Sequence, residues 1–472
     1  MDERLLNGLY TDRYELTMAL AYWRAGRAQE PAVFDTFFRK APFGGGYAVF
    51  AGLGPLFDAL RSYRFSGEEV AFLEKDGFPG DFLEYLASFR FRGAVFSPPE
   101  GEVVFPLETV ARVEGGLLEA QIIETLILNV LNFHTLIATK AARCRRSAGK
   151  RSLSEFGLRR AQGLGGLWAS RAACIGGFDT TSNLAAAKAW NLPAAGTMAH
   201  SFVQAYDDEL TAFRRFAEAH DDATVLLLDT YDTLRSGLPN AIRVAGEMRE
   251  HGRALKGVRL DSGDLAYLSR QVRRALDEAG LEKVAIFASN QLDEYVIQSL
   301  LNQEAPIDAF GVGTGLATGQ PDGALDGVYK LAETGGKPRM KSSETVAKAT
   351  FPGRKAVTRY YDADGMMVAD AIHLADEEPP ERMWHPHETH SSLNLAGFEQ
   401  RPLLAEGYRE GAPATEPVPV SESASYAREV LAALPSEHQR LENPHIYKVG
   451  LSPRLRDLRD DWLKHNGKAR ES

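Results

Sequence analysis

The stretch TVLLLDTYD, residues 224–232, shows the pattern that decides the fold, because a short apolar run ends there in an acidic turn. Three later stretches repeat the pattern and end in acidic, polar or glycine-rich turns: residues 257–264, 284–290 and 307–314. Helical patterns follow, and the turns recur at intervals close to the ~30 residues of a strand–helix–strand unit. Short, continuously apolar strands between helices are typical of a parallel sheet that is covered on both faces.

Earlier turns at residues 155–157, 177–179 and 196–200 keep a similar rhythm, which brings the number of such units to six or seven. That number predicts a complete or incomplete β/α barrel, and a doubly wound parallel sheet is the second possibility. The chain is irregular before and after this region, so we expect its two ends to pair into a second α+β domain. The predicted division is an N-terminal α+β segment, an α/β barrel catalytic domain, and a C-terminal segment that returns to the α+β domain and ends in a helical tail: residues 1–140, 141–338 and 339–472.

Local signals predict several further elements. Ser66 and Glu69 have the spacing of a capping box at a helix start, and residues 119–140 carry apolar side chains at helical spacing. Residues 362–365 are typical of a hairpin turn. We interpret the cationic run at 143–151 as the solvated end of a helix.

The composition excludes several classes of protein. The chain has 472 residues, with 54 basic and 64 acidic side chains and a formal net charge of −10. Because affinity for a phosphate backbone needs clustered positive charge, a general nucleic-acid binder is not expected. Cys144 and Cys174 form no CxxC pair, which argues against structural zinc, iron–sulfur clusters and a disulfide framework. No stretch is apolar enough to span a membrane, and the N-terminus lacks the order of a signal peptide, so we expect a cytoplasmic enzyme.

Residues that can bind a ligand follow the predicted strands. Ligands of parallel α/β sheets bind at the carboxyl ends of the strands, because the loops converge there. These strand ends carry one histidine and five carboxylates: His200, Asp179, Asp229, Asp232, Asp261 and Asp264. Glycine turns expose backbone N–H groups to phosphate, while carboxylates suit Mg²⁺ or the hydroxyl groups of a ribose. The combination is what a phosphosugar bound with Mg²⁺ would need.

Each of these signals also has a structural interpretation. Residues 261–264 can form a plain N-cap turn, and residues 311–315 can form a tight strand-to-helix turn, since they lack the spacing of a dinucleotide-binding loop. His200 can be a hydrogen-bonded structural histidine. Two other functions remain open at this point: a metal-dependent barrel lyase or isomerase that uses Asp229 and Asp261 as metal ligands, and a non-catalytic nucleotide sensor.

Taken together and in order, the motifs resemble those of the nicotinate phosphoribosyltransferase family. The matching stretches are residues 9–18, 37–40, 155–163, 176–183, 196–202, 228–232, 258–265, 288–290, 310–314, 327–331 and 337–341. The resemblance spans most of the chain before residue 345. It implies a type II phosphoribosyltransferase fold, which is an incomplete α/β barrel with an α+β domain built from both ends of the chain.

The resemblance also implies an activity. Members of the family form nicotinate mononucleotide and pyrophosphate from nicotinate and phosphoribosyl pyrophosphate in NAD salvage, coupled to ATP hydrolysis and with Mg²⁺. By this resemblance His200 becomes a phosphohistidine, and Asp229 or Asp232 could orient its ring. Nicotinamide phosphoribosyltransferase is the alternative, with the same fold and a different substrate.

The resemblance implies substrate-binding roles position by position. Arg259, Asp261 and Gly263 match the segment that holds the ribose and its pyrophosphate with Mg²⁺, for which Asp261 is the candidate ligand. Phe156 and Arg159 match the positions on either side of the pyridine ring. The phosphate-binding turns are matched by Ser289, Asn290, Gly311, Gly313 and Thr314.

The remaining matches concern the ring substituent and the partner subunit. Asp179 matches an acid that hydrogen-bonds the carboxamide in nicotinamide-using relatives, which would oppose the carboxylate of nicotinate unless the acid turns away, is protonated or is offset by an arginine. Thr180, with residues 181–182 and a nearby arginine, is expected to meet the substrate carboxylate. Asp12 and Tyr14 match a segment that reaches the ring site from the neighbouring subunit, so a homodimer with shared active sites is implied.

Overall fold

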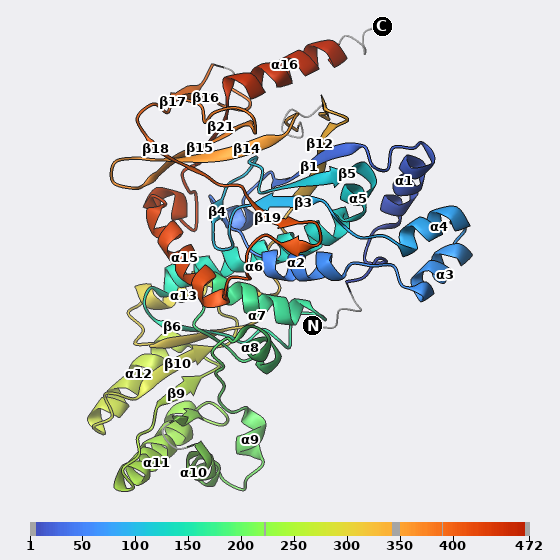
Figure 1. Cartoon of the computed structure of the whole chain (residues 1–472). Coiled ribbons are helices and arrows are strands. Elements are labelled where there is room, and N and C mark those ends of the chain that lie inside the picture. Colours follow the sequence, from blue (N-terminus) through green and yellow to red (C-terminus); the bar gives the residue numbers. More distant parts are fainter. Residues whose placement is uncertain (1–5, 221–222, 342–349, 389, 468–472) are drawn as a thin grey trace. The chain divides into compact units, whose positions relative to one another are not determined.

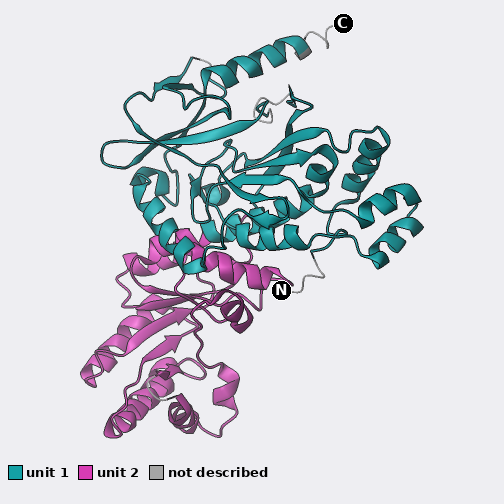
Figure 2. Cartoon of the chain, in the orientation of Figure 1, with its two compact units in different colours: residues 1–139, 324–472 teal, residues 140–323 magenta. Residues whose placement is uncertain are grey.

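The structure, a computed structural model of the chain, describes residues 6–220, 223–341, 350–388 and 390–467 (Figure 1). The chain divides into two compact units (Figure 2). Unit 1 combines residues 1–139 with residues 324–472, and unit 2 comprises residues 140–323. The chain therefore begins one unit, builds the other, and returns to complete the first.

A sheet of parallel strands forms the centre of unit 2. Within the described residues the sheet has the strand order β7-β6-β11-β10-β9-β8. The strands are β6 Ser152–Glu155, β7 Thr180–Thr181, β8 Val225–Leu227, β9 Gly257–Leu260, β10 Ala285–Ser289 and β11 Ala309–Val312. Because β11 pairs in parallel with β6, the strands follow the chain around a barrel that stays open between β7 and β8. The predicted incomplete α/β barrel is confirmed.

Helices alternate with these strands along the chain. They are α7 Gly165–Ile175, α8 Leu184–Trp190, α9 His200–Gln204, α10 Glu209–His220, α11 Leu238–Glu250, α12 Leu265–Glu278, α13 Glu294–Asn302 and α14 Thr314–Ala317, with a short helical turn η3 at Thr233–Gly237. In α12, Val272 and Leu276 are buried one turn apart, as expected for a helix that packs one face on a sheet. The Asp264 carboxylate caps this helix by accepting a hydrogen bond from the Tyr267 N–H at 3.0 Å. The N-cap interpretation of the 261–264 turn therefore holds for Asp264.

The main sheet of unit 1 draws strands from both ends of the chain. Its order within the described residues is β13-β12-β1-β5-β3-β19-β20. The strands are β1 Pro31–Phe38, β3 Ala94–Ser97, β5 Ala111–Gly116, β12 Gly327–Thr334, β13 Lys337–Pro338, β19 Ala405–Arg409 and β20 Ala412–Pro413. Strand β1 pairs antiparallel with β12 on one side and with β5 on the other, which confirms the predicted domain of two segments. Because β12 belongs to this sheet, unit 2 ends at residue 323 and not at the expected residue 338.

A second sheet in unit 1 comes from the C-terminal segment alone, with the order β17-β16-β21-β15-β14-β18. The strands are β14 Lys355–Tyr361, β15 Met367–Leu374, β16 Arg382–Trp384, β17 Ser392–Asn394, β18 Glu399–Pro402 and β21 Lys448–Leu451. Strands β14 and β15 pair antiparallel around the predicted hairpin turn at 362–365. Two short strands, β2 Ala48–Val49 and β4 Val103–Val104, form a separate pair.

The helices of unit 1 test two local predictions. They are α1 Arg13–Arg24, α2 Leu53–Ser62, α3 Gly67–Lys75, α4 Gly80–Ala87, α5 Leu117–Ile122, α6 Glu124–Ala148 (which continues into unit 2), α15 Val420–Ala433 and α16 Pro453–Gly467. The predicted capping box is confirmed, since the Glu69 N–H donates to Ser66 Oγ at 3.3 Å and the Ser66 N–H donates to the Glu69 carboxylate at 2.6 Å. The single helix predicted over 119–140 is wrong, because it is interrupted at Ile123. No helix in the described parts of the chain is long and apolar enough to cross a membrane.

The cationic run at 143–151 is a solvated helix end only in part: Arg146, Lys150 and Arg151 are exposed at the end of α6, whereas Arg143 is buried and Arg145 is only partly exposed. Arg143 is 2% exposed and donates from Nε to Glu294 at 2.8 Å, and Lys140 forms an ion pair with the same carboxylate. Arg145 donates to Asp179 at 2.6 Å. Both acids are distant in the sequence, so the run alone could not reveal its partners.

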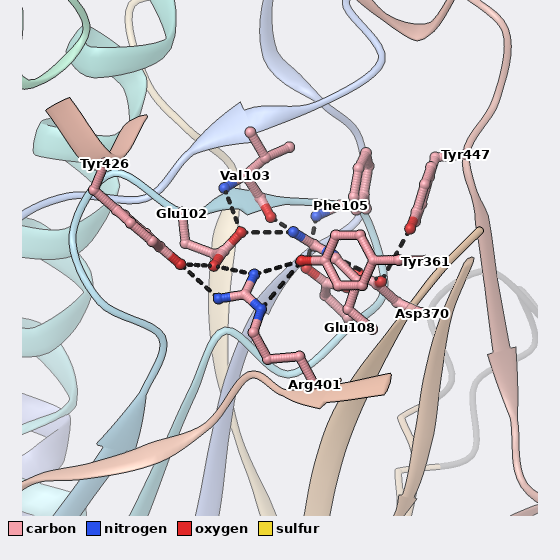
Figure 3. A network of polar contacts seen from close by, with 10 residues as sticks. Glu102, Val103, Phe105, Glu108, Tyr361, Asp370, Arg401, Tyr426 and Tyr447 are labelled. Atoms are coloured by element: carbon pink, nitrogen blue, oxygen red, sulfur yellow. Dashed lines mark hydrogen bonds and ion pairs between the residues drawn. The ribbon is translucent and has the colours of Figure 1, made fainter. Parts of the chain in front are cut away.

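A buried charge network joins the two chain segments of unit 1 (Figure 3). The fully buried Arg359 donates to Asp370 at 2.9 and 2.6 Å and to Glu102 at 2.6 Å. Arg401 donates to the other oxygen of Glu102 at 2.8 Å, and the Tyr426 hydroxyl donates to that oxygen as well. Since Glu102 belongs to the N-terminal segment and the other four residues to the C-terminal segment, the network fastens the two segments together.

Candidate active site

The carboxyl ends of β8, β9 and β10 carry acidic and hydroxyl side chains that the sequence singled out. Asp229 follows β8, Asp261 follows β9, and Ser289 is the last residue of β10. These strands are parallel neighbours, so the three side chains lie at one edge of the sheet. Arg259, the third residue of β9, belongs to the same edge.

Arg259 holds this group of side chains together. Its guanidinium donates to Asp261 at 2.7 Å, to Ser289 Oγ at 2.8 Å and to Thr197 Oγ1 at 3.0 Å. The Ser289 hydroxyl also contacts the Asp261 carboxylate. Hydrogen bonds between ionised groups are short and strong, and the Arg259 side chain is only 16% exposed. The arrangement places a cation, an acid and hydroxyl groups at fixed positions, which suits a substrate that carries both hydroxyls and phosphates.

His200 lies beside this group as the first residue of α9, with 40% of its side chain exposed. Its Nδ1 lies 3.1 Å from Thr230 Oγ1, and its Nε2 lies 3.9 Å from Asp261 Oδ2. Thr230, rather than Asp229 or Asp232 on either side of it, therefore makes the close contact with the ring. His200 is neither buried in an apolar interior nor distant from the 259–261 segment.

Asp229 and Asp232 have different surroundings. Asp229 Oδ2 accepts hydrogen bonds from the Asp261 N–H at 3.1 Å and from the Ser262 hydroxyl at 2.5 Å. Its Oδ1 is buried and has no hydrogen-bond partner among the described residues. Asp232 accepts from the Leu234 N–H at 3.1 Å and caps η3. Asp229 thus keeps a free carboxylate oxygen at the site, whereas Asp232 is used locally.

Phe156 follows β6, and its ring packs against the backbone of β11. A Cβ atom at Gly311 would lie 2.4 Å from this ring, so glycine is required there while the ring keeps its position. The guanidinium carbon of Arg259 lies 5.6 Å from the ring centroid, within range of a cation–π interaction. Arg159, which is expected on the other side of the pyridine ring, lies in an exposed turn, and its contact with the substrate stays a prediction. Arg259 therefore contacts Phe156 from the neighbouring strand end.

The predicted phosphate-binding turns have unusual backbone geometry. Gly263 has φ +77°, which favours glycine. Asn290 and Gln291, directly after β10, both have left-handed φ values of 81° and 50°. Such conformations are uncommon without glycine and cluster at functional sites. Gly313 and Thr314 open the short helix α14.

Asp179 and Thr180 lie at the edge strand β7. Asp179 precedes this strand, whereas we expected it to follow one. Its Oδ2 accepts hydrogen bonds from Arg145 at 2.6 Å and from the Leu153 N–H at 2.8 Å, so an arginine offsets its charge. Thr180 Oγ1 lies 2.8 Å from Ser154 Oγ.

Asp12 and Tyr14 belong to unit 1 and not to the barrel. Asp12 directly precedes α1 and accepts a hydrogen bond from Thr125 Oγ1 at 3.3 Å. The Tyr14 side chain is 47% exposed. Their role in the site of a neighbouring subunit stays a prediction.

Sequence reasoning missed several residues of this region. Three of them supply hydroxyl groups: Thr197 contacts Arg259, Thr230 contacts His200, and Ser262 contacts Asp229. Each belongs to a motif that matches the family, and for Thr230 and Ser262 the available signal was a hydroxyl next to a strand-end acid. For Arg145 there was no such signal, because its partner is 34 positions away.

The two cysteines have no part in this site. Cys144 and Cys174 are free and buried. Burial raises the pKa of the Cys174 thiol to about 12 and also raises that of Cys144. Both remain protonated near neutral pH, and a thiol is a poor nucleophile.

An open α/β barrel with polar side chains gathered at the carboxyl ends of its strands is the architecture of an α/β-barrel enzyme. Comparison with known proteins shows to which family of α/β-barrel enzymes the chain belongs. Family models match residues 9–132 (nicotinate phosphoribosyltransferase N-terminal domain), 151–365 (nicotinate phosphoribosyltransferase family) and 354–459 (nicotinate phosphoribosyltransferase C-terminal domain). The chain belongs to the nicotinate phosphoribosyltransferase family, as its motifs indicated.

Individual relatives agree with this assignment. The nicotinate phosphoribosyltransferase of Bacillus subtilis (strain 168) is 44% identical over 94% of this chain and 92% of its own length. That of Bos taurus is 38% identical over 96% of each chain. The crystal structure of human nicotinic acid phosphoribosyltransferase is 35% identical and has a TM-score of 0.86, covering 96% of this chain and 99% of that one.

Proposed function

We propose that this enzyme forms nicotinate mononucleotide and pyrophosphate from nicotinate and phosphoribosyl pyrophosphate, and that it couples this reaction to ATP hydrolysis through phosphorylation of His200. In this role it supplies a pyridine nucleotide for NAD salvage. The observation that carries the proposal is the placement of the His200 imidazole 3.9 Å from Asp261, which is itself bonded to Arg259 and Ser289.

The transfer step needs positioning more than acid–base chemistry. The pyridine nitrogen uses its own lone pair to form the bond to the anomeric carbon, while the bond from that carbon to pyrophosphate breaks and pyrophosphate leaves with the electron pair. Positive charge develops on the sugar and negative charge on the leaving group. The Asp261 carboxylate can stabilise the former and the Arg259 guanidinium the latter, because fixed charges cost no reorganisation at the moment of reaction.

The ATP-coupled step uses the exposed imidazole. A ring nitrogen of neutral His200 forms a bond to the γ-phosphorus of ATP, the bond to the bridging oxygen breaks, and ADP leaves. Water later cleaves the phosphorus–nitrogen bond, releases phosphate and restores the free imidazole. The contact with Thr230 holds the ring in one orientation for both steps.

Mg²⁺ fits the carboxylates of this edge. The ion prefers oxygen ligands, keeps several waters and is held by one or two carboxylates together with substrate phosphates. Asp229 and Asp261 are the residues that would hold it, since the buried Oδ1 of Asp229 has no partner in the described structure. Bound there, Mg²⁺ would neutralise charge on the pyrophosphate. The described residues contain no group of three acids, histidines or cysteines that could hold a metal without the substrate.

The remaining parts of the proposal concern assembly and substrate choice. We infer a homodimer in which Asp12 and Tyr14 reach the site of the partner, and a cytoplasmic location. Nicotinate is the preferred substrate over nicotinamide, since the matched relatives are named for the acid. A comparison of kcat/KM for the acid and the amide tests this preference, and a larger value for the amide would overturn it.

The central experiment combines the purified enzyme with nicotinate, phosphoribosyl pyrophosphate, Mg²⁺ and ATP, and measures the mononucleotide. Product is expected, and its absence would reject the proposed reaction. His200→Ala should lose both ATP stimulation and acid-labile labelling from γ-labelled ATP. His251→Ala is the matched control, because His251 is an exposed histidine in the same unit, at the end of α11. Labelling that persists in His200→Ala would exclude His200 as the acceptor.

A further inference from the structure

Unit 1 contains a cavity of about 800 Å³ that lies outside the barrel. Its wall is built from the segment after β1, the loop before β21, and the β16–β17 hairpin. Apolar residues such as Leu107, Met383 and Pro444 line it, and Ile446 at its edge is 84% exposed. The volume falls within the range of small-molecule sites, which are mostly apolar with a few polar groups.

The charged groups of this cavity all have one sign. Arg39, Lys40 and Lys448 line it together with the imidazoles of His385 and His445, and no carboxylate occurs among the described residues of its wall. Acidic residues are close in the chain at Glu388 and Glu437, but they are not part of the lining. In a chain with a net charge of −10, a cavity whose lysine and arginine side chains face no carboxylate in the described lining favours an anion.

A second observation points to a bound ligand. The Nε atom of Arg39 is buried and has no hydrogen-bond partner among the described residues. The guanidinium carbon lies 5.5 Å from the Phe37 ring centroid, so the side chain rests on this aromatic face. A buried donor without a partner is costly, and an anion in the cavity would remove that cost. Lys40 and Lys448 are exposed and able to turn towards the same ligand.

We propose that this cavity is a second nucleotide site, which binds the phosphate groups of a nucleotide through Arg39, Lys40 and Lys448 and its ring through the apolar wall. Guanidinium and ammonium groups together suit phosphate oxygens, since the first forms paired hydrogen bonds and the second acts as a point charge. The glycine turn at Gly44–Gly46 forms part of the wall without side chains, which leaves room for the ligand. This site is made entirely by unit 1, whereas the residues proposed for catalysis in the barrel belong to unit 2.

Photolabelling of the full-length protein with 8-azido-ATP tests the proposal. Labelled peptides are identified by mass spectrometry, and labelling is repeated with excess inorganic pyrophosphate or excess ATP. We expect label within residues 383–386, 391–393 or 444–449, which contain residues that line the cavity. Protection by pyrophosphate would show that phosphate groups suffice for binding, and protection by ATP alone would show that the whole nucleotide is needed; both support the site. Label confined to barrel peptides would overturn it.

A charge reversal at Lys448 provides the matched variant. Lys448→Glu should weaken labelling of the cavity peptides about tenfold, which corresponds to about 1.4 kcal/mol. Lys464→Glu, at a side chain that is 71% exposed on α16, makes the same change of charge outside the cavity and should leave the label unchanged. Equal labelling of the two variants would reject the site. Mononucleotide formation is measured separately, so a failure of the proposed reaction leaves the labelling result readable.

Discussion

At the scale of single residues, the hydroxyl of Thr230 distinguishes this site from one built of acids alone. Thr230 lies between Asp229 and Asp232 in the chain, yet it is the residue within 3.1 Å of His200 Nδ1. A neutral hydroxyl orients an imidazole without adding negative charge beside it. At Nδ1, this arrangement adds no charge repulsion to the phosphorylation that we propose for the ring.

Thr230→Val should therefore lower kcat of the ATP-coupled reaction about fivefold, because a hydrogen bond contributes roughly 1 kcal/mol. The KM for nicotinate should not change, since Thr230 is not proposed to touch the pyridine ring. Thr230→Ser keeps the hydroxyl and serves as the control. Equal values of kcat for Thr230→Val and the wild type would show that the contact has no part in positioning His200.

Part of the candidate site could be predicted from the sequence, and part could not. Asp229, Asp261 and Ser289 were accessible because residues after parallel strands must meet at one edge. The contact between Arg259 and Phe156 was not, since it depends on how the residue after β6 packs against β9. The partner of Asp179 was likewise hidden, because no local pattern records an ion pair between a helix end and a strand start.

At the scale of elements, helix α1 carries a buried acid in its first turn. Glu15 is fully buried and accepts a hydrogen bond from Gln121 Nε2 at 2.6 Å. Burial, with a smaller contribution from the neighbouring acids Glu124 and Asp12, raises the pKa of Glu15 to about 7, and the hydrogen bonds from Gln121 and Tyr14 oppose this rise. Folding therefore favours the protonated acid up to about neutral pH.

This raised pKa predicts a pH dependence of stability. The unfolded chain releases the Glu15 proton near pH 4.5, whereas the folded chain keeps it to about pH 7, so the free energy of unfolding should fall between these values as pH rises. The slope from one group is at most about 1.4 kcal/mol per pH unit. Urea unfolding of Glu15→Gln at several pH values should show a flatter profile, with exposed Glu84→Gln as the control. A wild-type slope in Glu15→Gln would contradict this assignment.

Helices and strands could be predicted from the sequence where their hydrophobic pattern is long and regular. The barrel strands were found because buried parallel strands are continuously apolar and bounded by turns. Strands β16 and β21 were missed, because a segment of three or four residues, such as Lys448–Leu451, is too short to show an alternation of apolar and polar residues that would distinguish it from a loop. The break at Ile123 was also hidden, because apolar residues continue through it at helical spacing.

At the scale of the whole molecule, stability of unit 1 depends on contacts between distant parts of the chain. Arg359 connects Glu102 of the N-terminal segment to Asp370 of the C-terminal one, with all three residues fully buried. Removing one member of a buried ion network leaves the other charges buried without a partner. The loss of stability from such a change is larger than the net stability that the intact network contributes.

Arg359→Met should accordingly reduce the free energy of unfolding by about 3–5 kcal/mol, measured by urea denaturation. Arg354→Met is the comparison, because Arg354 pairs with Glu114 on the surface at 49% exposure, and such pairs contribute less than about 1 kcal/mol. Similar losses in the two variants would mean that the buried network does not stabilise the unit.

The position of β1 between β5 and β12 has a consequence for how the protein is made. A ribosome releases the chain from its N-terminus, so β1 and β5 emerge before any residue of the barrel, and β12 emerges after all of it. Throughout the translation of residues 140–323, one side of β1 has no strand to pair with. Unpaired edges recruit other chains, and the nascent protein is therefore most in need of chaperones while its catalytic barrel is being synthesised.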